Sequence, residues 1–100
     1  MESIILNKKF LGPYNSTEKI KNKAGIYIVI CEAFGMTPVR VLDAGDTENV
    51  KETLRTEKKK GFLKNYSPSL PLKFLVHYEN DYNVRAKLKR KIRKELHPVM

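Results

Sequence analysis

One apolar run constrains the fold of this chain more than any other feature. Residues 25–31 read Gly-Ile-Tyr-Ile-Val-Ile-Cys, without a charged side chain among them. β-Branched and aromatic residues favour strands, and successive side chains of a strand point to opposite faces of the sheet. The run therefore predicts a strand that is buried on both faces, in a sheet with other layers packed against it.

The other elements follow from turn and capping residues. Gly-Met-Thr-Pro at 35–38 indicates a turn, so residues 39–44 are predicted to be a second strand that forms a hairpin with the first. Gly45-Asp46-Thr47 is expected to supply a turn and the N-cap of a helix over 47–60 that ends at Gly61. Residues 72–78 are predicted to form a third strand, and Asn80 or Asp81 the cap of a helix over 81–96. The order is strand, strand, helix, strand, helix, which predicts an α+β fold with a small antiparallel or mixed three-stranded sheet flanked by helices.

The length of 100 residues predicts one domain, with an entry segment at 1–23 and a core at 24–98. In the entry segment, Gly12-Pro13-Tyr14 predicts a turn, followed by a short helical turn through Ile20. Hydrophobic residues make up 41% of the chain and charged residues 31%, which is typical of a folded protein rather than a disordered one. No apolar run reaches 18 residues, so we expect a soluble, cytoplasmic protein without a membrane partner.

The net charge of +9 is concentrated in two basic segments, residues 51–64 and 81–100. The first carries six cations against two carboxylates, giving +4, and the second seven against two, giving +5; the other residues balance. This distribution favours a surface that binds a polyanion. The predicted phosphate-binding cations are Lys58, Lys59, Lys60, Arg85, Lys87, Lys89, Arg90, Lys91, Arg93 and Lys94. Two solvated helix faces would give the same pattern, and that alternative stays open.

The closing helix carries a drifting apolar stripe of Val84, Leu88, Ile92 and Leu96, which is expected to face the sheet. Lys87, Arg90, Lys91 and Lys94 then point away from the sheet. Arg85 and Lys89 fall within the stripe or at its edge, where long cations bury their stems and keep their charges in water.

Two short motifs in register resemble those of the GIY-YIG endonuclease family. Gly25-Ile26-Tyr27 begins the first strand, and Asp43-Ala44-Gly45 ends the second. Thr47, Asn49, Val50 and Leu54 follow at the spacing of the family's helix, and the resemblance extends over residues 24–98, to Pro98. It implies a nuclease fold in which a Tyr helps to activate water, an Arg stabilises the developing phosphorane charge and a Glu binds a divalent metal ion.

This chain departs from the family at the positions that carry the chemistry. Tyr27 stands at the first Tyr, but Asp43 replaces the second, Thr53 stands at the Arg position and Lys89 at the Glu position. An ammonium group in place of a carboxylate repels a metal ion rather than binding it. The loss of the Arg also removes transition-state stabilisation of about 3 kcal/mol. The resemblance therefore implies a vestigial Tyr27 and an inactive site without a metal or other cofactor, in which Tyr27, Thr53 and Lys89 nevertheless cluster.

Three functions remain open. The first is a catalytically inactive nucleic-acid-binding domain, with DNA favoured over RNA and with Tyr27, Tyr66 or Tyr82 available for base contacts. The second is a protein-interaction or inhibitor domain whose basic face binds an acidic protein partner. The third is a metal-dependent DNA endonuclease with a rearranged site at Asp43, Asp46, Glu48 and Glu57, although acidic residues at this place commonly complement a helix N-terminus.

Overall fold

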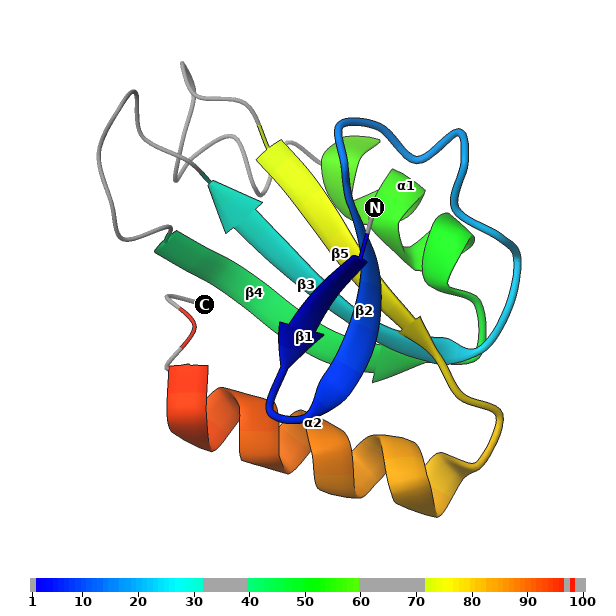
Figure 1. Cartoon of the computed structure of the whole chain (residues 1–100). Helices are drawn as coiled ribbons and strands as arrows, with labels where there is room; N and C mark the ends of the chain where they lie inside the picture. Colours follow the sequence, from blue (N-terminus) through cyan, green and yellow to red (C-terminus); the bar gives the residue numbers. More distant parts are fainter. Residues whose placement is uncertain (1, 32–39, 60–71, 97, 99–100) are drawn as a thin grey trace.

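The chain folds into an antiparallel sheet with one helix against each face (Figure 1). The computed structural model describes residues 2–31, 40–59, 72–96 and 98, with the backbone alone at residues 2, 3, 31, 40 and 57–59. The elements are β1 (Glu2–Ile5), β2 (Lys8–Tyr14), β3 (Gly25–Cys31), β4 (Arg40–Thr47), α1 (Val50–Lys59), β5 (Leu72–Tyr78) and α2 (Tyr82–Leu96). The predicted α+β class is confirmed. Among the described residues after 24, the elements follow as strand, strand, helix, strand and helix.

The described residues form a sheet of five strands in the order β1-β2-β5-β3-β4, whereas the sequence predicted three. The predicted entry segment supplies the two additional strands. β3 pairs with β4 on one side and along its full length with β5 on the other, from Gly25 opposite Tyr78 to Cys31 opposite Leu72. Because β3 has a neighbour on both edges and a helix layer on both faces, its unbroken apolar sequence is explained.

The side chains of β3 alternate between two core clusters. One cluster lies on the α1 side and includes Tyr27, Val29, Val50 and Leu54. The other lies on the α2 side and includes Ile26, Ile28, Ile30, Leu88 and Ile92. The prediction of a strand buried on both faces is thus confirmed.

The amino-terminal hairpin of β1 and β2 turns through two residues in the left-handed conformation, Leu6 with φ 49° and Asn7 with φ 65°. The expected turn at residues 12–14 is instead a bulge within β2, where Gly12 has φ 109° and precedes a cis Pro13. The expected helical turn is reduced to a single backbone hydrogen bond from the Ile20 N–H to the Thr17 carbonyl (3.2 Å). The first part of the entry segment is therefore a β-hairpin.

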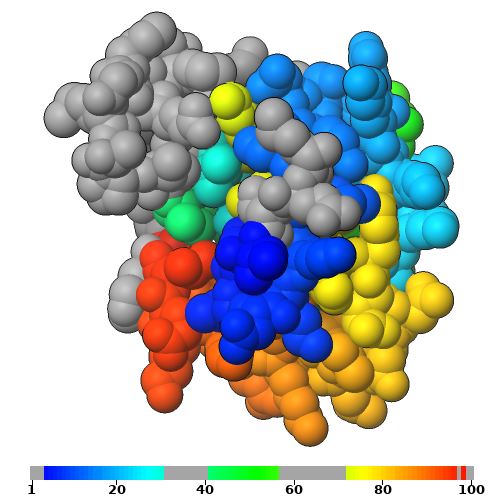
Figure 2. Space-filling model, in the orientation of Figure 1, coloured from blue at the N-terminus to red at the C-terminus, as the bar shows by residue number. Residues whose placement is uncertain are grey.

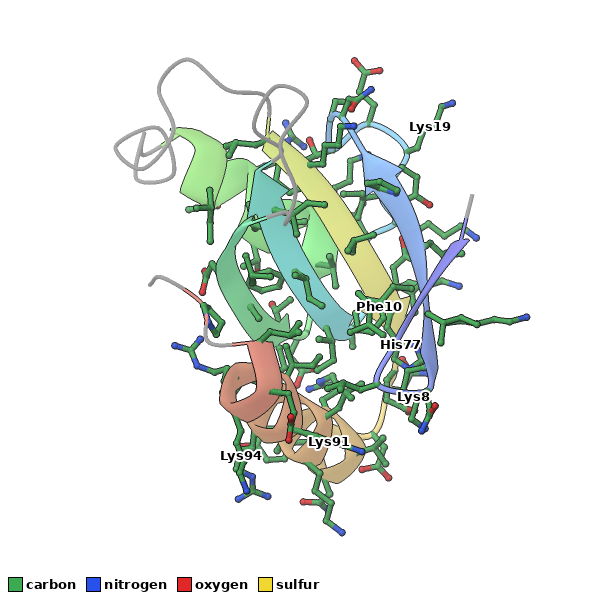
Figure 3. All side chains as sticks on the ribbon, turned by 60° about the vertical axis from the view of Figure 1, so that its left-hand side comes forward. Lys8, Phe10, Lys19, His77, Lys91 and Lys94 are labelled. Atoms are coloured by element: carbon green, nitrogen blue, oxygen red, sulfur yellow. The ribbon has the colours of Figure 1, made fainter. Side chains whose placement is uncertain are left out.

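A side-chain contact ties the hairpin to the rest of the sheet. The His77 Nδ1–H of β5 donates to the Lys9 carbonyl at 2.9 Å, and the His77 ring lies 5.5 Å from that of Phe10. Figure 3 shows these two rings side by side between β2 and β5. Phe10 is fully buried and belongs to the cluster on the α2 side, so the hairpin contributes to the core.

Two helix starts are set by capping residues. The Asn49 side chain accepts a hydrogen bond from the Glu52 N–H at 3.1 Å, so the N-cap of α1 is Asn49 and not, as predicted, a residue of Gly45-Asp46-Thr47. Thr47 still belongs to β4, which runs three residues past its predicted end. Asp81 caps α2 by accepting from the N–H groups of Asn83 and Val84 (2.8 and 3.2 Å), as one of the two predicted alternatives.

Candidate functional site

The three positions that the GIY-YIG resemblance assigns to catalysis do not form one cluster. Tyr27 packs on the α1 side of the sheet, and the Thr53 hydroxyl, on α1, is hydrogen-bonded to that of Thr47 at 2.7 Å. Lys89 lies on α2, where its Nζ is 3.1 Å from the Asp46 carboxylate. Asp46 is paired with Ile26, whose side chain belongs to the cluster on the α2 side. The sheet therefore lies between Lys89 and the other two residues, so the three side chains do not share one face of it.

Tyr27 has a packing role in this fold. It is buried and pairs directly with Gly45 across the β3–β4 hairpin. A Cβ atom on Gly45 would lie 2.6 Å from the Tyr27 hydroxyl oxygen and 2.8 Å from Cζ. The ring thus covers a strand glycine, an arrangement that protects the backbone of a residue without a side chain.

Asp43 stands at the position of the second Tyr in the GIY-YIG pattern. Together with Arg93, it forms hydrogen bonds to the backbone at the outer edge of β4. The Asp43 carboxylate accepts the N–H of Ala44 at 2.8 Å, and Arg93 donates to the Ala44 carbonyl at 2.7 Å. The two side chains also form an ion pair at 3.6 Å. Both polar backbone groups of Ala44 are thereby satisfied at an edge strand.

Two further acidic residues of the alternative metal site are paired with cations. Asp46 contacts Lys89 and Arg85, and Glu48 contacts Arg85. The Glu57 side chain lies outside the described residues. Within the described ranges, no group of three His, Cys, Asp or Glu residues is placed to share a metal ion.

Arg85 is the largest fully buried side chain that the structure describes, with 1% of its surface exposed. Its guanidinium group donates to the Glu48 carboxylate (2.7 Å) and to the backbone carbonyls of Glu79 and Asn80 (3.1 and 2.9 Å). Its Nε lies 3.8 Å from the Asp46 carboxylate without a hydrogen bond. Because it is buried, Arg85 cannot reach a phosphate, so it does not belong among the predicted phosphate-binding cations.

The helix is rotated slightly from the predicted orientation. Arg85 rather than Val84 continues the buried row through Leu88 and Ile92, while Val84 is 39% exposed. The spacing of three and four residues from Arg85 to Leu88 and Ile92 is the signal in the sequence that could have identified it.

The cations of α2 form two rows. The inner row, at intervals of four residues, is Arg85, Lys89 and Arg93. Each of them pairs with an acidic residue that lies on β4 or, for Glu48, directly after it. The outer row is Lys87, Arg90, Lys91 and Lys94, all of them predicted to point away from the sheet. All four side chains of the outer row are exposed. Within the part of the chain that is described, none of them forms an ion pair. The inner row is therefore neutralised locally and the outer row is not.

The turn between β1 and β2 brings a cation to α2 that the sequence did not single out. Lys8 lines a groove together with Lys87 and Lys91, and Figure 3 shows Lys8 and Lys91 at the same end of the molecule, with Lys19 at the opposite end. Residues outside the two basic segments balance in charge, so only knowledge of the hairpin would have distinguished Lys8 from the other lysines.

The first basic segment is only partly described. Lys58 and Lys59 lie in the last turn of α1, with their side chains outside the described residues, and Lys60 lies outside the described residues altogether. Because α1 and α2 cover opposite faces of the sheet, the two basic segments start from opposite sides of it.

Tyrosines suited to base contacts are distributed unevenly. Tyr82 is exposed at the start of α2, with the Arg85 guanidinium 5.8 Å from its ring centroid, and Tyr66 lies outside the described residues. Burial and, secondarily, the neighbouring Tyr78 raise the pKa of Tyr14 above its ordinary value, so this phenol stays neutral.

Comparison of the chain with protein-family models, curated proteins and solved structures finds no match. Within the described residues, neither helix has the length and apolar character that crossing a membrane requires.

Proposed function

We propose that this protein is a nucleic-acid-binding domain that contacts phosphates through the outer row of α2 and does not cut its ligand. The observation that carries the proposal is the division of the α2 cations into a neutralised inner row and an exposed outer row. Four cations that have no acidic partner among the described residues lie on one face of a helix and repel one another, and a polyanion relieves that repulsion. DNA is the first ligand to test, and RNA the second.

The geometry of the outer row limits the size of the contact. Lys87 and Lys94 are seven residues apart, which corresponds to about 10 Å along the helix axis. A row of this length contacts about four phosphates. Counterion release then gives a slope of log affinity against log salt concentration of about −3.6 for duplex DNA and about −2.8 for a single strand.

A charge-reversal pair tests whether the outer row is the contact surface. We expect Arg90→Glu combined with Lys94→Glu to weaken binding at least tenfold at low salt and to make the salt slope shallower by about 2, because two phosphate contacts are lost. Lys19→Glu combined with Lys21→Glu is the matched control, since it changes the net charge equally with exposed residues of the loop after β2. Figure 3 shows Lys19 at the end of the molecule opposite Lys94. The control should weaken binding no more than about threefold, through the general field alone. Equal losses for the two pairs, measured by fluorescence anisotropy, would contradict the assignment.

The absence of cutting is tested with the same protein. We expect no cleavage of DNA or RNA in Mg²⁺ or Mn²⁺, because the position of the metal-binding carboxylate is occupied by Lys89, which is itself paired with Asp46. Tyr27→Phe should leave the binding affinity unchanged, since Tyr27 is a buried residue under α1. Metal-dependent cleavage that Tyr27→Phe abolishes would overturn this part of the proposal. No binding to any nucleic acid at low salt would favour an acidic protein partner instead.

A further inference from the structure

A groove of about 250 Å³ lies between the β1–β2 turn and the first half of α2. Its apolar lining is Leu6, Val84 and Leu88, and its charged lining is Lys8, Lys87 and Lys91. Figure 1 shows the turn coming down onto α2, and Figure 2 shows the surface of this hairpin, in blue, lying against that of α2, in orange.

The hairpin places its two residues of the groove by different means. Leu6 is held in the left-handed conformation, which is unfavourable for a leucine, and packs against the core cluster on the α2 side. Lys8 begins β2 immediately after the turn and is exposed. The turn therefore presents an apolar side chain and a cation to the same helix.

The charges around the groove are of one sign. Lys87 and Lys91 are one helical turn apart on α2, and Lys8 lies across from them on the hairpin. None of the three has an ion pair within the described part of the chain. A complementary ligand combines an apolar body with anionic groups on either side of it.

We infer that this groove binds an unpaired base of a single-stranded nucleic acid, while the flanking phosphates contact Lys8 and the Lys87–Lys91 pair. The inference rests on the proposed function and specifies its ligand. A single strand alternates anionic phosphates with bases whose faces are free to pack on an apolar surface. In a duplex those faces are stacked, so a duplex would contact the lysines and leave Leu6, Val84 and Leu88 uncovered. An amphipathic acidic peptide also combines the two chemistries, and the test below separates it.

The test compares a single-stranded oligonucleotide with the duplex of the same sequence. We expect the intact protein to bind the single strand more tightly, and Val84→Ser to weaken single-strand binding about fivefold by removing apolar contact. Duplex affinity should change less than twofold, and the salt slopes should not change, because no charge is removed. Val84 is 39% exposed, so the substitution is compatible with folding. Ile4→Ser is the matched control, because Ile4 is 73% exposed on β1 and does not line the groove.

The outcomes distinguish this inference from the function on which it rests. Equal affinity for single strand and duplex, with no effect of Val84→Ser, would overturn the groove assignment; a large effect of Arg90→Glu with Lys94→Glu in the same assay would still support phosphate binding by the outer row. Absence of binding to both nucleic acids would overturn both proposals. Binding of a Glu-Leu-rich peptide that Val84→Ser weakens, without binding of either oligonucleotide, would assign the groove to a protein partner and overturn the inference.

Discussion

Replacing Arg85 by alanine is expected to lower the free energy of unfolding by about 3 kcal/mol. Arg85 is 1% exposed, and its removal leaves the carbonyls of Glu79 and Asn80 without their donor. Breaking a buried ion pair at one partner costs about 3–5 kcal/mol. The lower end applies here because Glu48 is exposed and can be hydrated, and because Asp46 keeps its contact with Lys89.

Denaturant unfolding of two further variants separates the possible causes. Arg90→Ala is the matched control on the same helix; its side chain is exposed, so the change should stay within about 0.5 kcal/mol. Arg85→Lys keeps the charge but cannot reach both carbonyls and Glu48 with one ammonium group, so it should recover only part of the loss. A loss below about 1 kcal/mol for Arg85→Ala, or full recovery with lysine, would show that the fork of hydrogen bonds does not stabilise the fold.

Gly25→Ala is expected to be nearly as destabilising, with a loss of about 2–3 kcal/mol. A Cβ atom at Gly25 would lie 2.5 Å from the His77 carbonyl oxygen and 3.0 Å from the Tyr78 Cα. Both are backbone atoms of β5, so β3 and β5 have to move apart at a point where they are paired. The first glycine of the motif that resembles the GIY-YIG family thus has a structural explanation in strand packing.

Gly45→Ala is the matched comparison for Gly25→Ala, since the same methyl group is added to the neighbouring hairpin strand. Its Cβ would meet the end of the Tyr27 side chain rather than the backbone. A ring can tilt where a paired strand cannot, so we expect a smaller loss of about 1 kcal/mol. The reverse order of the two losses in thermal or denaturant unfolding would show that Tyr27 is held more rigidly than β5.

The sequence predicted the strongly patterned elements and missed the weakly patterned ones. The apolar run of β3 and the long closing helix both form where expected. An apolar run of this length favours a strand that is buried on two faces, and Asp81 marks the start of the helix as its cap. The hairpin of β1 and β2 was missed because Gly12 and Pro13 indicate a turn, whereas the structure uses them in a bulge inside a strand. Gly and Pro residues indicate that the backbone bends, but they do not indicate whether a strand continues after the bend.

The candidate site was predictable only in part, for a related reason. A count of charges identified α2, and its exposed outer row follows from the helical period. The count could not separate these cations from Arg85, Lys89 and Arg93, since their acidic partners lie on β4 or just after it. The sequence did not indicate that Lys89 and Tyr27 lie on opposite faces of the sheet, because matching residues along the chain does not say on which face each one lies.

The hydrogen bonds that Asp43 and Arg93 make to the backbone of Ala44 hinder self-association of the protein through β4. β4 is an outer strand of the sheet, and an outer strand with free N–H and C=O groups is a template on which a second chain can add. At Ala44 both groups are already bonded within the molecule, so an incoming strand would have to displace an ion pair before it could form its hydrogen bonds. Arg93 thus protects the protein against sheet extension on this side, although by composition alone it is one more cation of a basic helix.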